Sequence, residues 1–334
     1  MKKNLLITLL FIYAFANAQD PIYTQYYNIP QVINPGATAI RESASAGIIH
    51  RSQWPEADLK INSNYAFYNT YSEEMNSALG VNILSQRESF SKYHLTQVNF
   101  AYAYRVQLNR NWFFHPAIEV GYGNKSYGFQ NLVLGDQLNI DSGTINPTTA
   151  DPTILNENVG YFDFSAGAII NTDKFWFGIT IKHLNRPEID FTNSKNMRLD
   201  MFYSFSGSYT FGFQELPRIL PNNTQLLVSA NYMQQGSYNR LDVGAGVQFS
   251  SITVGAIAAT NPSNISDNGI TSINPYLSFE YEHFRIGYSY DIVTNGMGRN
   301  GGVHEISFVY LFDLIKDCDG CPRYFKPKSK TYLY

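Results

Sequence analysis

The chain has 334 residues, of which 44% are hydrophobic and 15% charged, well below the roughly 25% charged residues of an average soluble domain. So apolar a chain is not disordered, and a mean hydropathy of −0.24 excludes a bundle of membrane-spanning helices. The net charge of −3 gives no basic field for nucleic acid, and two cysteines cannot form a disulfide framework. This composition suits a β-structure with one apolar face and one uncharged polar face.

Residues 1–18, MKKNLLITLLFIYAFANA, have the layout of a secretory signal peptide. Two lysines precede an apolar run from Leu5 to Ala16, and Ala16-Asn17-Ala18 is a small-x-small cleavage site. The run has about 12 residues, whereas a spanning helix needs about 20. We predict cleavage before Gln19, which leaves 22 basic and 27 acidic residues and a net charge of −5. No later apolar run approaches the length of a spanning helix, so the exported chain is either soluble or embedded in a membrane as strands.

From residue 43 almost to the end, apolar residues recur at every second position. Phe162 and Phe164, for example, alternate with Asp163 and Ser165. A spacing of two is the geometry of a strand. Such segments lie at 43–51, 61–70, 77–86, 93–106, 111–123, 160–171, 174–183, 198–212, 225–234, 239–249, 251–260, 274–282, 284–292 and 303–312. We therefore predict an all-β fold, a transmembrane antiparallel β-barrel over residues 43–312 with about 14 strands, 12 or 16 being the alternatives.

The charged residues favour a membrane barrel over a soluble β-sandwich or propeller. A soluble sandwich turns its charges outward, but here they share the parity of glycine and serine, opposite the apolar positions. The predicted lumen-facing set is Glu119, Asp163, Asp200, Asp242, Asp291 and Glu305 with Lys182, Arg198, Arg240 and Arg285. If the first strand starts in the periplasm, connections on that side are mostly short and those outside mostly long, as in outer-membrane barrels. The connections 213–224 and 235–238 depart from this rule.

The two ends of the mature chain are predicted to lie outside the barrel wall. Residues 19–42 form a periplasmic lead or plug, because Pro30 and Pro35 exclude a regular helix or a central strand. Residues 313–334 form a periplasmic tail, with five basic and two acidic residues after Ile315, which is either a frayed end or a docking segment. In this tail Cys318 and Cys321 form either a local disulfide or two thiols tied to a partner.

Three motifs resemble those of the PorP/SprF family of type IX secretion-associated outer-membrane proteins. The lead QDPIYTQYYNIPQVINPGATA resembles the family's N-terminal motif, and His50-Arg51-Ser52-Gln53-Trp54 resembles its basic-x-Gln-Trp element. The segments IGYSYD (286–291) and GGVHEIS (301–307) resemble its C-terminal signature. After Asn-Pro the family usually has residues like Ala-Tyr-Ala-Gly, where this chain has Gly-Ala-Thr-Ala. The residues shared with the family motifs are Tyr26, Pro30, Asn34, Pro35, His304 and Glu305.

The resemblance implies a non-enzymatic outer-membrane barrel that assists export or surface attachment of a large secreted adhesin in gliding bacteria. The implied contact is the adhesin's C-terminal domain, and further partners are type IX secretion or gliding envelope components and outer-membrane lipid. We expect the long external loops to hold the adhesin and the basic tail to contact periplasmic components. The candidate partner-binding residues are Arg51, Gln53, Trp54, Cys318, Cys321 and Arg323.

The sequence carries no recognisable catalytic motif, so no enzymatic activity, cofactor or metal is predicted. The six histidines are scattered singly, and His304 and Glu305 lie on opposite faces of one strand. The rival function is a passive or selective outer-membrane channel, because a barrel of this size can hold water. The lead or the long segment 124–159 could instead fill such a lumen.

Overall fold

The computed structural model describes residues 20–128, 137–139, 142–147, 158–191, 197–212, 224–264, 269–294 and 301–312. Its long strands are β1 (Ser45–Gln53), β2 (Ile61–Ser72), β3 (Ser77–Glu88), β4 (His94–Tyr104), β6 (Phe113–Ser126), β9 (Asn158–Asn171), β10 (Phe175–Lys182), β11 (Phe202–Phe211), β12 (Thr224–Gln235), β13 (Tyr238–Phe249), β14 (Ile252–Thr260), β15 (Ile270–Tyr281), β16 (Phe284–Val293) and β17 (Val303–Leu311). The short elements are β5 (Val106–Gln107), β7 (Leu138–Asn139), β8 (Thr144–Ile145) and the 3-10 turns η1 (Thr24–Tyr27), η2 (Pro30–Val32), η3 (Pro35–Ala39) and η8 (Pro262–Asn264).

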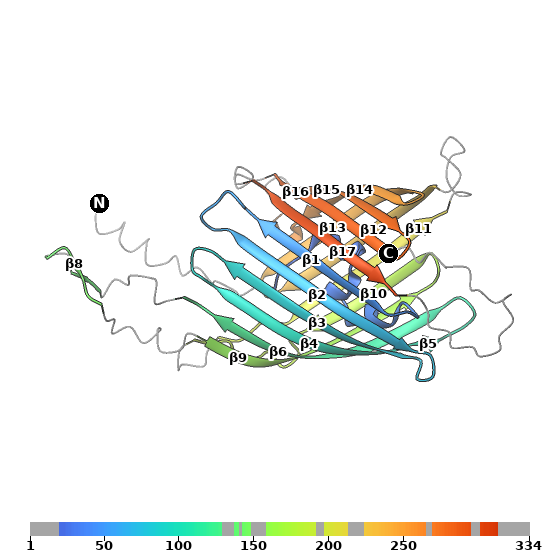
Figure 1. Ribbon diagram of the computed structural model, residues 1–334, viewed down its shortest axis with the longest axis horizontal. Helices are drawn as coiled ribbons and strands as arrows, with labels where there is room; N and C mark the ends of the chain where they lie inside the picture. Colours follow the sequence, from blue (N-terminus) through green and yellow to red (C-terminus); the bar gives the residue numbers. More distant parts are fainter. Residues whose placement is uncertain are drawn as a thin grey trace.

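The long strands close into one barrel of 14 antiparallel strands (Figure 1). Successive strands pair in chain order, β4 pairs with β6, and β1 pairs with β17 where the first and last strands meet. Closure leaves no sheet edge, so every strand finds backbone hydrogen-bond partners, which a wall surrounded by lipid requires. The predicted barrel and its strand number are confirmed. No helix in the described parts of the chain is long and apolar enough to cross a membrane.

The two rims of the barrel differ in their connections. We call the end where β1 begins and β17 ends the turn rim, and the opposite end the loop rim. The turn rim carries the connections β9–β10, β13–β14 and β15–β16, all of two or three residues, and the loop rim carries the long connections β6–β9 and β10–β11 (left in Figure 1). The structure also has the two departures from this rule that the sequence predicts. The long β11–β12 connection lies at the turn rim, and the short β12–β13 turn lies at the loop rim.

Side chains alternate between the two faces of the wall as the sequence predicts. On β9, Phe162 is 63% exposed on the outer face, while Asp163 beside it is 2% exposed and faces the lumen. On β17, Ile306 is exposed and Glu305 is buried. The outer face is thus apolar and the inner face polar, the arrangement of a barrel that stands in lipid.

One predicted strand border misplaces two charged residues. Residues 198–201 were assigned to a strand, but β11 begins at Phe202. Arg198 is exposed and forms an isolated bridge with Glu188 in the β10–β11 connection, and Asp200 pairs there with Arg186. Both residues therefore lie at the loop rim rather than in the lumen. The alternation of apolar residues continued into the connection, which concealed the border.

The main apolar core lies inside the barrel, between the wall and the segment that precedes β1. We call this segment the lead, and the structure describes it from residue 20 to 44 (dark blue in Figure 1). Its apolar residues pack against inward-facing residues of several strands, so the lumen is filled by the chain itself. This core cluster consists of Tyr23, Tyr26, Tyr27, Ile29, Val32 and Ile33 from the lead with Ile49, Tyr65, Phe67, Ile257, Tyr276 and Val309 from the wall.

Candidate functional site

The lead crosses the lumen from the loop rim to the turn rim. Asp20 contacts the loop-rim ends of β10 and β12, and Ala44 accepts a hydrogen bond from Phe312 beside the turn-rim end of β17. Between these points the lead forms three single 3-10 turns, two of which begin at a proline. Proline fixes φ and donates no hydrogen bond, which favours such short turns over a continuous helix. The lead is therefore an irregular segment whose place depends on its contacts with the wall.

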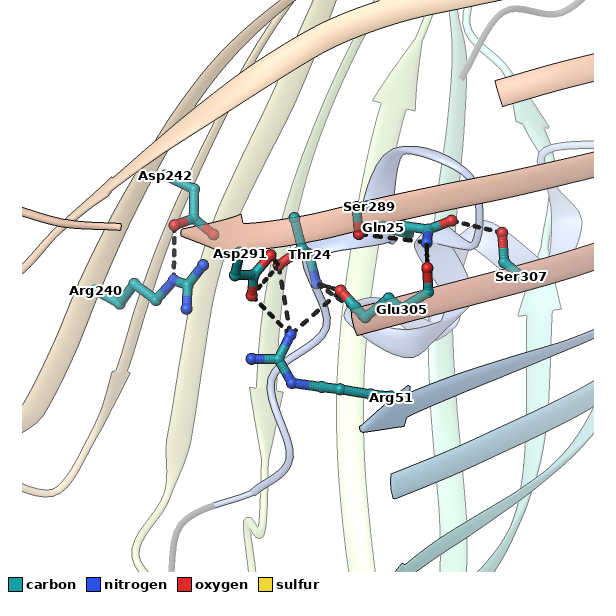
Figure 2. A network of polar contacts seen from close by, with 9 residues as sticks. All are labelled: Thr24, Gln25, Arg51, Arg240, Asp242, Ser289, Asp291, Glu305 and Ser307. Carbon is teal, nitrogen blue, oxygen red and sulfur yellow. Dashed lines mark hydrogen bonds and ion pairs between the residues drawn. The ribbon is translucent and has the colours of Figure 1, made fainter. Parts of the chain in front are cut away.

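We call residues 20–28 the ionic end of the lead. Within it, Thr24 lies beside a buried cluster of charges (Figure 2). Arg51 Nη1 lies 3.0 Å from Asp291 Oδ2 and 3.3 Å from Glu305 Oε1. The backbone N–H of Thr24 donates to Glu305 Oε1 at 2.5 Å, and its hydroxyl donates to Asp291 Oδ1 at 2.9 Å. These residues come from β1, β16 and β17, so the cluster joins the lead to the seam at which the barrel closes. A second buried pair, Arg240 with Asp242, lies beside it.

Amide side chains extend this contact along the lead. Gln25 Nε2 donates to the backbone carbonyl of Glu305 at 3.0 Å, and Gln25 Oε1 accepts from the Ser307 hydroxyl at 2.6 Å. Asn28 Nδ2 donates to the Ser307 hydroxyl at 3.1 Å. Both amides lie so close to Gly287 on β16 that a Cβ at that position would overlap them. A larger residue there would force these amide side chains to move, so the glycine allows the close approach of the lead.

The packed end of the lead, residues 34–40, is held by shape. Asn34 caps η3 by accepting from the Gly36 N–H at 2.8 Å, and its Nδ2 donates to the carbonyls of Ala168 and Ile179 at 3.2 and 3.0 Å. A Cβ at Gly36 would lie 2.8 Å from the His115 carbonyl oxygen, so only glycine fits against this wall. Ala39 packs against three further alanines, Ala78, Ala103 and Ala117.

Asp20 starts a third set of contacts at the loop rim. Its Oδ2 lies 2.8 Å from His183 Nε2, and His183 Nδ1 lies 2.9 Å from Asp163 Oδ2. Carboxylate oxygens only accept hydrogen bonds when ionised, so both ring nitrogens donate and the ring is an imidazolium. Burial alone would lower the pKa of His183, but the charges of Asp20 and Asp163 and their hydrogen bonds outweigh burial and raise the pKa to about 9. Burial would raise the pKa of Asp20, but His183, Lys182 and Lys125 hold it well below its ordinary value.

A chain of side-chain hydrogen bonds continues from Asp163 across the wall. Gln97 donates to Asp163 Oδ2 at 3.1 Å and to Asn99 at 2.9 Å, Asn99 donates to Asn82 at 2.7 Å, and Asn82 donates to Glu119 Oε2 at 2.8 Å. This chain borders a cavity between the lead and the wall. Metal ligands do not gather there, since no group of three or more His, Cys, Asp or Glu side chains among the described residues could hold a metal ion.

The residues singled out from the sequence fall into four groups. Tyr26, Pro30, Asn34 and Pro35 lie in the lead and are buried in the lumen, where Arg51 and Glu305 on the wall form an ion pair. Gln53 and Trp54 lie where β1 reaches the loop rim, and the Trp54 N–H donates to the Gly302 carbonyl at 2.9 Å. His304 faces outward, with Nδ1 2.9 Å from the Tyr288 hydroxyl. Cys318, Cys321 and Arg323 lie outside the described residues.

Arg51 is buried in the lumen by the lead, so a partner reaches it only if the lead moves. Sequence reasoning missed Asp20 and treated His183 as one of six scattered histidines. His183 follows Lys182 at the end of β10, and strict alternation would turn one of the two outward. Its φ of 59° breaks the alternation, so both side chains face the lumen. The available signal was that Asp20 is the only charged residue between positions 20 and 40.

The family model of type IX secretion system membrane proteins PorP/SprF matches residues 15–310. The chain belongs to the PorP/SprF family. The match includes the lead and the whole barrel, so it covers both halves of the ionic cluster. Barrel fold and family together identify an outer-membrane protein associated with type IX secretion.

The chain is similar to several solved structures at low identity, and no curated protein sequence matches it. A Pseudomonas aeruginosa FadL homologue is 12% identical, with 84% of this chain and 93% of that chain covered and a TM-score of 0.43. The Acinetobacter baumannii outer membrane protein Omp33 is 8% identical, with 81% and 99% covered and a TM-score of 0.43. The TodX monoaromatic hydrocarbon channel is 8% identical, with 86% and 94% covered and a TM-score of 0.47.

Proposed function

We propose that this PorP/SprF protein is a non-enzymatic barrel that assists export or surface attachment of a large secreted adhesin by binding its C-terminal domain. Membership of a type IX secretion family supports a role in handling exported protein. The loop rim would face the cell exterior and meet the adhesin, and the turn rim would face type IX or gliding components of the periplasm. No cofactor enters this mechanism.

The observation that carries the proposal is that the lumen holds a polypeptide segment bound by specific side chains. The lead buries its three 3-10 turns and engages Arg51, Asp291 and Glu305 on the wall. A passive pore is kept open by a wide, unobstructed lumen, whereas this lumen is packed over much of its length. A lumen wall adapted to bind a peptide segment supports a role in protein handling over diffusion of small solutes.

Affinity capture tests the proposal directly. An affinity-tagged full-length chain, purified from outer membranes in mild detergent, should co-purify with one large exported protein. Deleting that protein's C-terminal domain should abolish capture while the barrel remains in the membrane. Recovery of only lipid and lipopolysaccharide from wild-type membranes would overturn the proposal.

Conductance in planar bilayers addresses the channel alternative. The full-length protein should give no steady conductance steps, because the lead fills the lumen. A variant lacking residues 20–40 provides the matched control, since its lumen should conduct if the barrel stays closed. Steady open-channel conductance of the full-length protein would favour the channel.

A further inference from the structure

Asp20 completes a balance of buried charge at the loop-rim end of the lumen. Three cationic groups surround it, namely His183, Lys182 and Lys125, all of which lower its pKa. The remaining acids around the site are Asp163 and Glu119. Without Asp20, His183 keeps only Asp163, and its Nε2 N–H is left without an acceptor. A buried cation without a partner is costly, so the wall requires an anion at this position.

The position occupied by Asp20 opens on the cavity between the lead and the wall, which Lys182 and His183 also line. Two buried polar atoms of the barrel wall that line it have no hydrogen-bond partner among the described residues, namely Tyr65 Oη and Asp163 Oδ1. Buried polar groups are normally paired, so unpaired groups in a cavity wall point to a polar ligand or solvent. They include both donors and acceptors, as binding of a peptide backbone requires.

The contacts of the lead show how the wall binds polypeptide. Lys182 Nζ donates to the backbone carbonyl of Val32 at 2.9 Å, and Glu305 accepts from the backbone N–H of Thr24. Backbone atoms are the same in every sequence, so such contacts accept other extended segments. The carboxylate of Asp20 is the one charged group that residues 20–40 of the lead contribute to these contacts.

We propose that the His183–Lys182 wall binds a carboxylate of a partner polypeptide in place of Asp20 when the ionic end of the lead withdraws. The inference rests on the proposed function, which supplies an exported polypeptide as the partner. Its carboxylate is either the C-terminal group or an Asp or Glu side chain of an extended segment. The lead is then a ligand in cis that keeps the site filled until the partner displaces it.

Peptide binding to an Asp20→Ala variant in detergent micelles tests this site. The probes are a fluorescein-labelled Gly/Ser/Tyr decapeptide with a free C-terminal carboxylate, the same peptide amidated, and an amidated version with one internal aspartate. The variant should bind the carboxylate peptide at least tenfold more tightly than the amidated one, and at least tenfold more tightly than wild type does. Tight binding of the aspartate peptide would assign the side-chain source, and its failure the C-terminal source.

The matched controls distinguish binding at this site from general electrostatic attraction between the peptide and the protein. Adding His183→Gln to Asp20→Ala should remove the discrimination, whereas adding His304→Gln, which changes an outward-facing histidine, should preserve it. Heat-modifiable gel mobility establishes folding, and Asp20→Asn replaces Asp20→Ala if that variant does not fold. Equal binding of carboxylate and amidated peptides, or discrimination that survives His183→Gln, would overturn the inference.

The two proposals fail separately. If the peptides are not discriminated but an exported protein still co-purifies with wild type, only the carboxylate site is overturned. If discrimination holds but no exported protein co-purifies, the site is supported and the adhesin partnership is overturned.

Discussion

The ionic end and the packed end of the lead are held in the same lumen by different forces. At the ionic end, Thr24 binds two carboxylates that share Arg51, and Asp20 binds an imidazolium. At the packed end, Gly36 and Ala39 fit against backbone and alanine methyl groups. Charged contacts respond to pH and to competing ions, whereas close packing responds to the volume of a side chain.

This difference suggests which end moves first. The packed end precedes β1 in the chain, and β1 is fixed in the wall. Because the packed end is closely packed against the wall, even a small displacement would disrupt its contacts. The ionic end is joined to the barrel only through side chains, and another charged segment can replace those contacts. We expect the ionic end to open while the packed end stays in place, and hydrogen exchange of residues 20–29 and 34–40 can measure the two separately.

Arg51→Met should have the largest effect, and it should be confined to the ionic end. The substitution leaves Asp291 and Glu305 buried without their shared cation, which costs about 3–5 kcal/mol in comparable sites. The opening free energy that hydrogen exchange measures around Thr24 should fall by about 3–5 kcal/mol. The change at residues 34–40 should be smaller. His50→Gln, which changes the outward-facing neighbour, should leave both ends as in wild type. A triple variant with Asp291→Asn and Glu305→Gln should recover most of the protection.

Equal loss of protection at both ends in Arg51→Met would contradict the comparison. It would mean that the lead binds as one cooperative unit, and that opening of one end alone does not occur.

A rise in pH should weaken the ionic end through His183. Its pKa is about 9 in the folded protein against 6.5 for a free side chain, so its contribution is full below pH 6.5 and is lost as pH rises through 9. A shift of this size corresponds to on the order of 3 kcal/mol. The charged groups that face His183 in this part of the lumen are Asp20, Asp163, Lys182, Lys125 and Glu119. Hydrogen exchange of the ionic end, compared between wild type and His183→Gln at each pH from 6 to 10, isolates the contribution of His183.

The difference in exchange protection of the ionic end between wild type and His183→Gln should become smaller above pH 9. Residues 34–40 should show no comparable change. A constant difference from pH 6 to pH 10 would exclude titration of His183 as the cause.

The sequence predicted the wall far better than the lumen. Alternation is a local signal, so Phe162 and Asp163 revealed their faces without any knowledge of their neighbours. The ionic cluster joins residues 240 to 281 positions apart, and no local pattern predicts that Arg51 meets Asp291 or that Thr24 meets Glu305. Pro30 and Pro35 predicted irregular structure in the lead, but its path through the lumen depends on closure of the barrel around it.

Gly36→Val should weaken the packed end and leave the ionic end nearly intact. The new side chain meets the backbone carbonyl of His115, which cannot rotate away, so the lead or the wall must shift. Overpacking of this kind costs about 1–3 kcal/mol. Trp176, which packs with Ala37 and Ile40, reports the change by fluorescence in a variant whose other two tryptophans are replaced by phenylalanine. Gly269→Ala adds its methyl group in open space and should have no effect.

The smallest effect is expected at the loop rim, where Arg186 and Asp200 form a pair that is also ionic but is exposed to solvent. Arg186 Nη2 lies 3.3 Å from Asp200 Oδ1, with side chains 50% and 33% exposed. Solvent screens such pairs, so Arg186→Gln should cost well under 1 kcal/mol and nothing measurable in 0.5 M salt. The cost of Arg51→Met should persist at that salt concentration, because its cluster is buried. If 0.5 M salt abolished the costs of both Arg51→Met and Arg186→Gln, the cluster around Arg51 would be hydrated. Burial of that cluster could then not be the reason that it holds the ionic end of the lead.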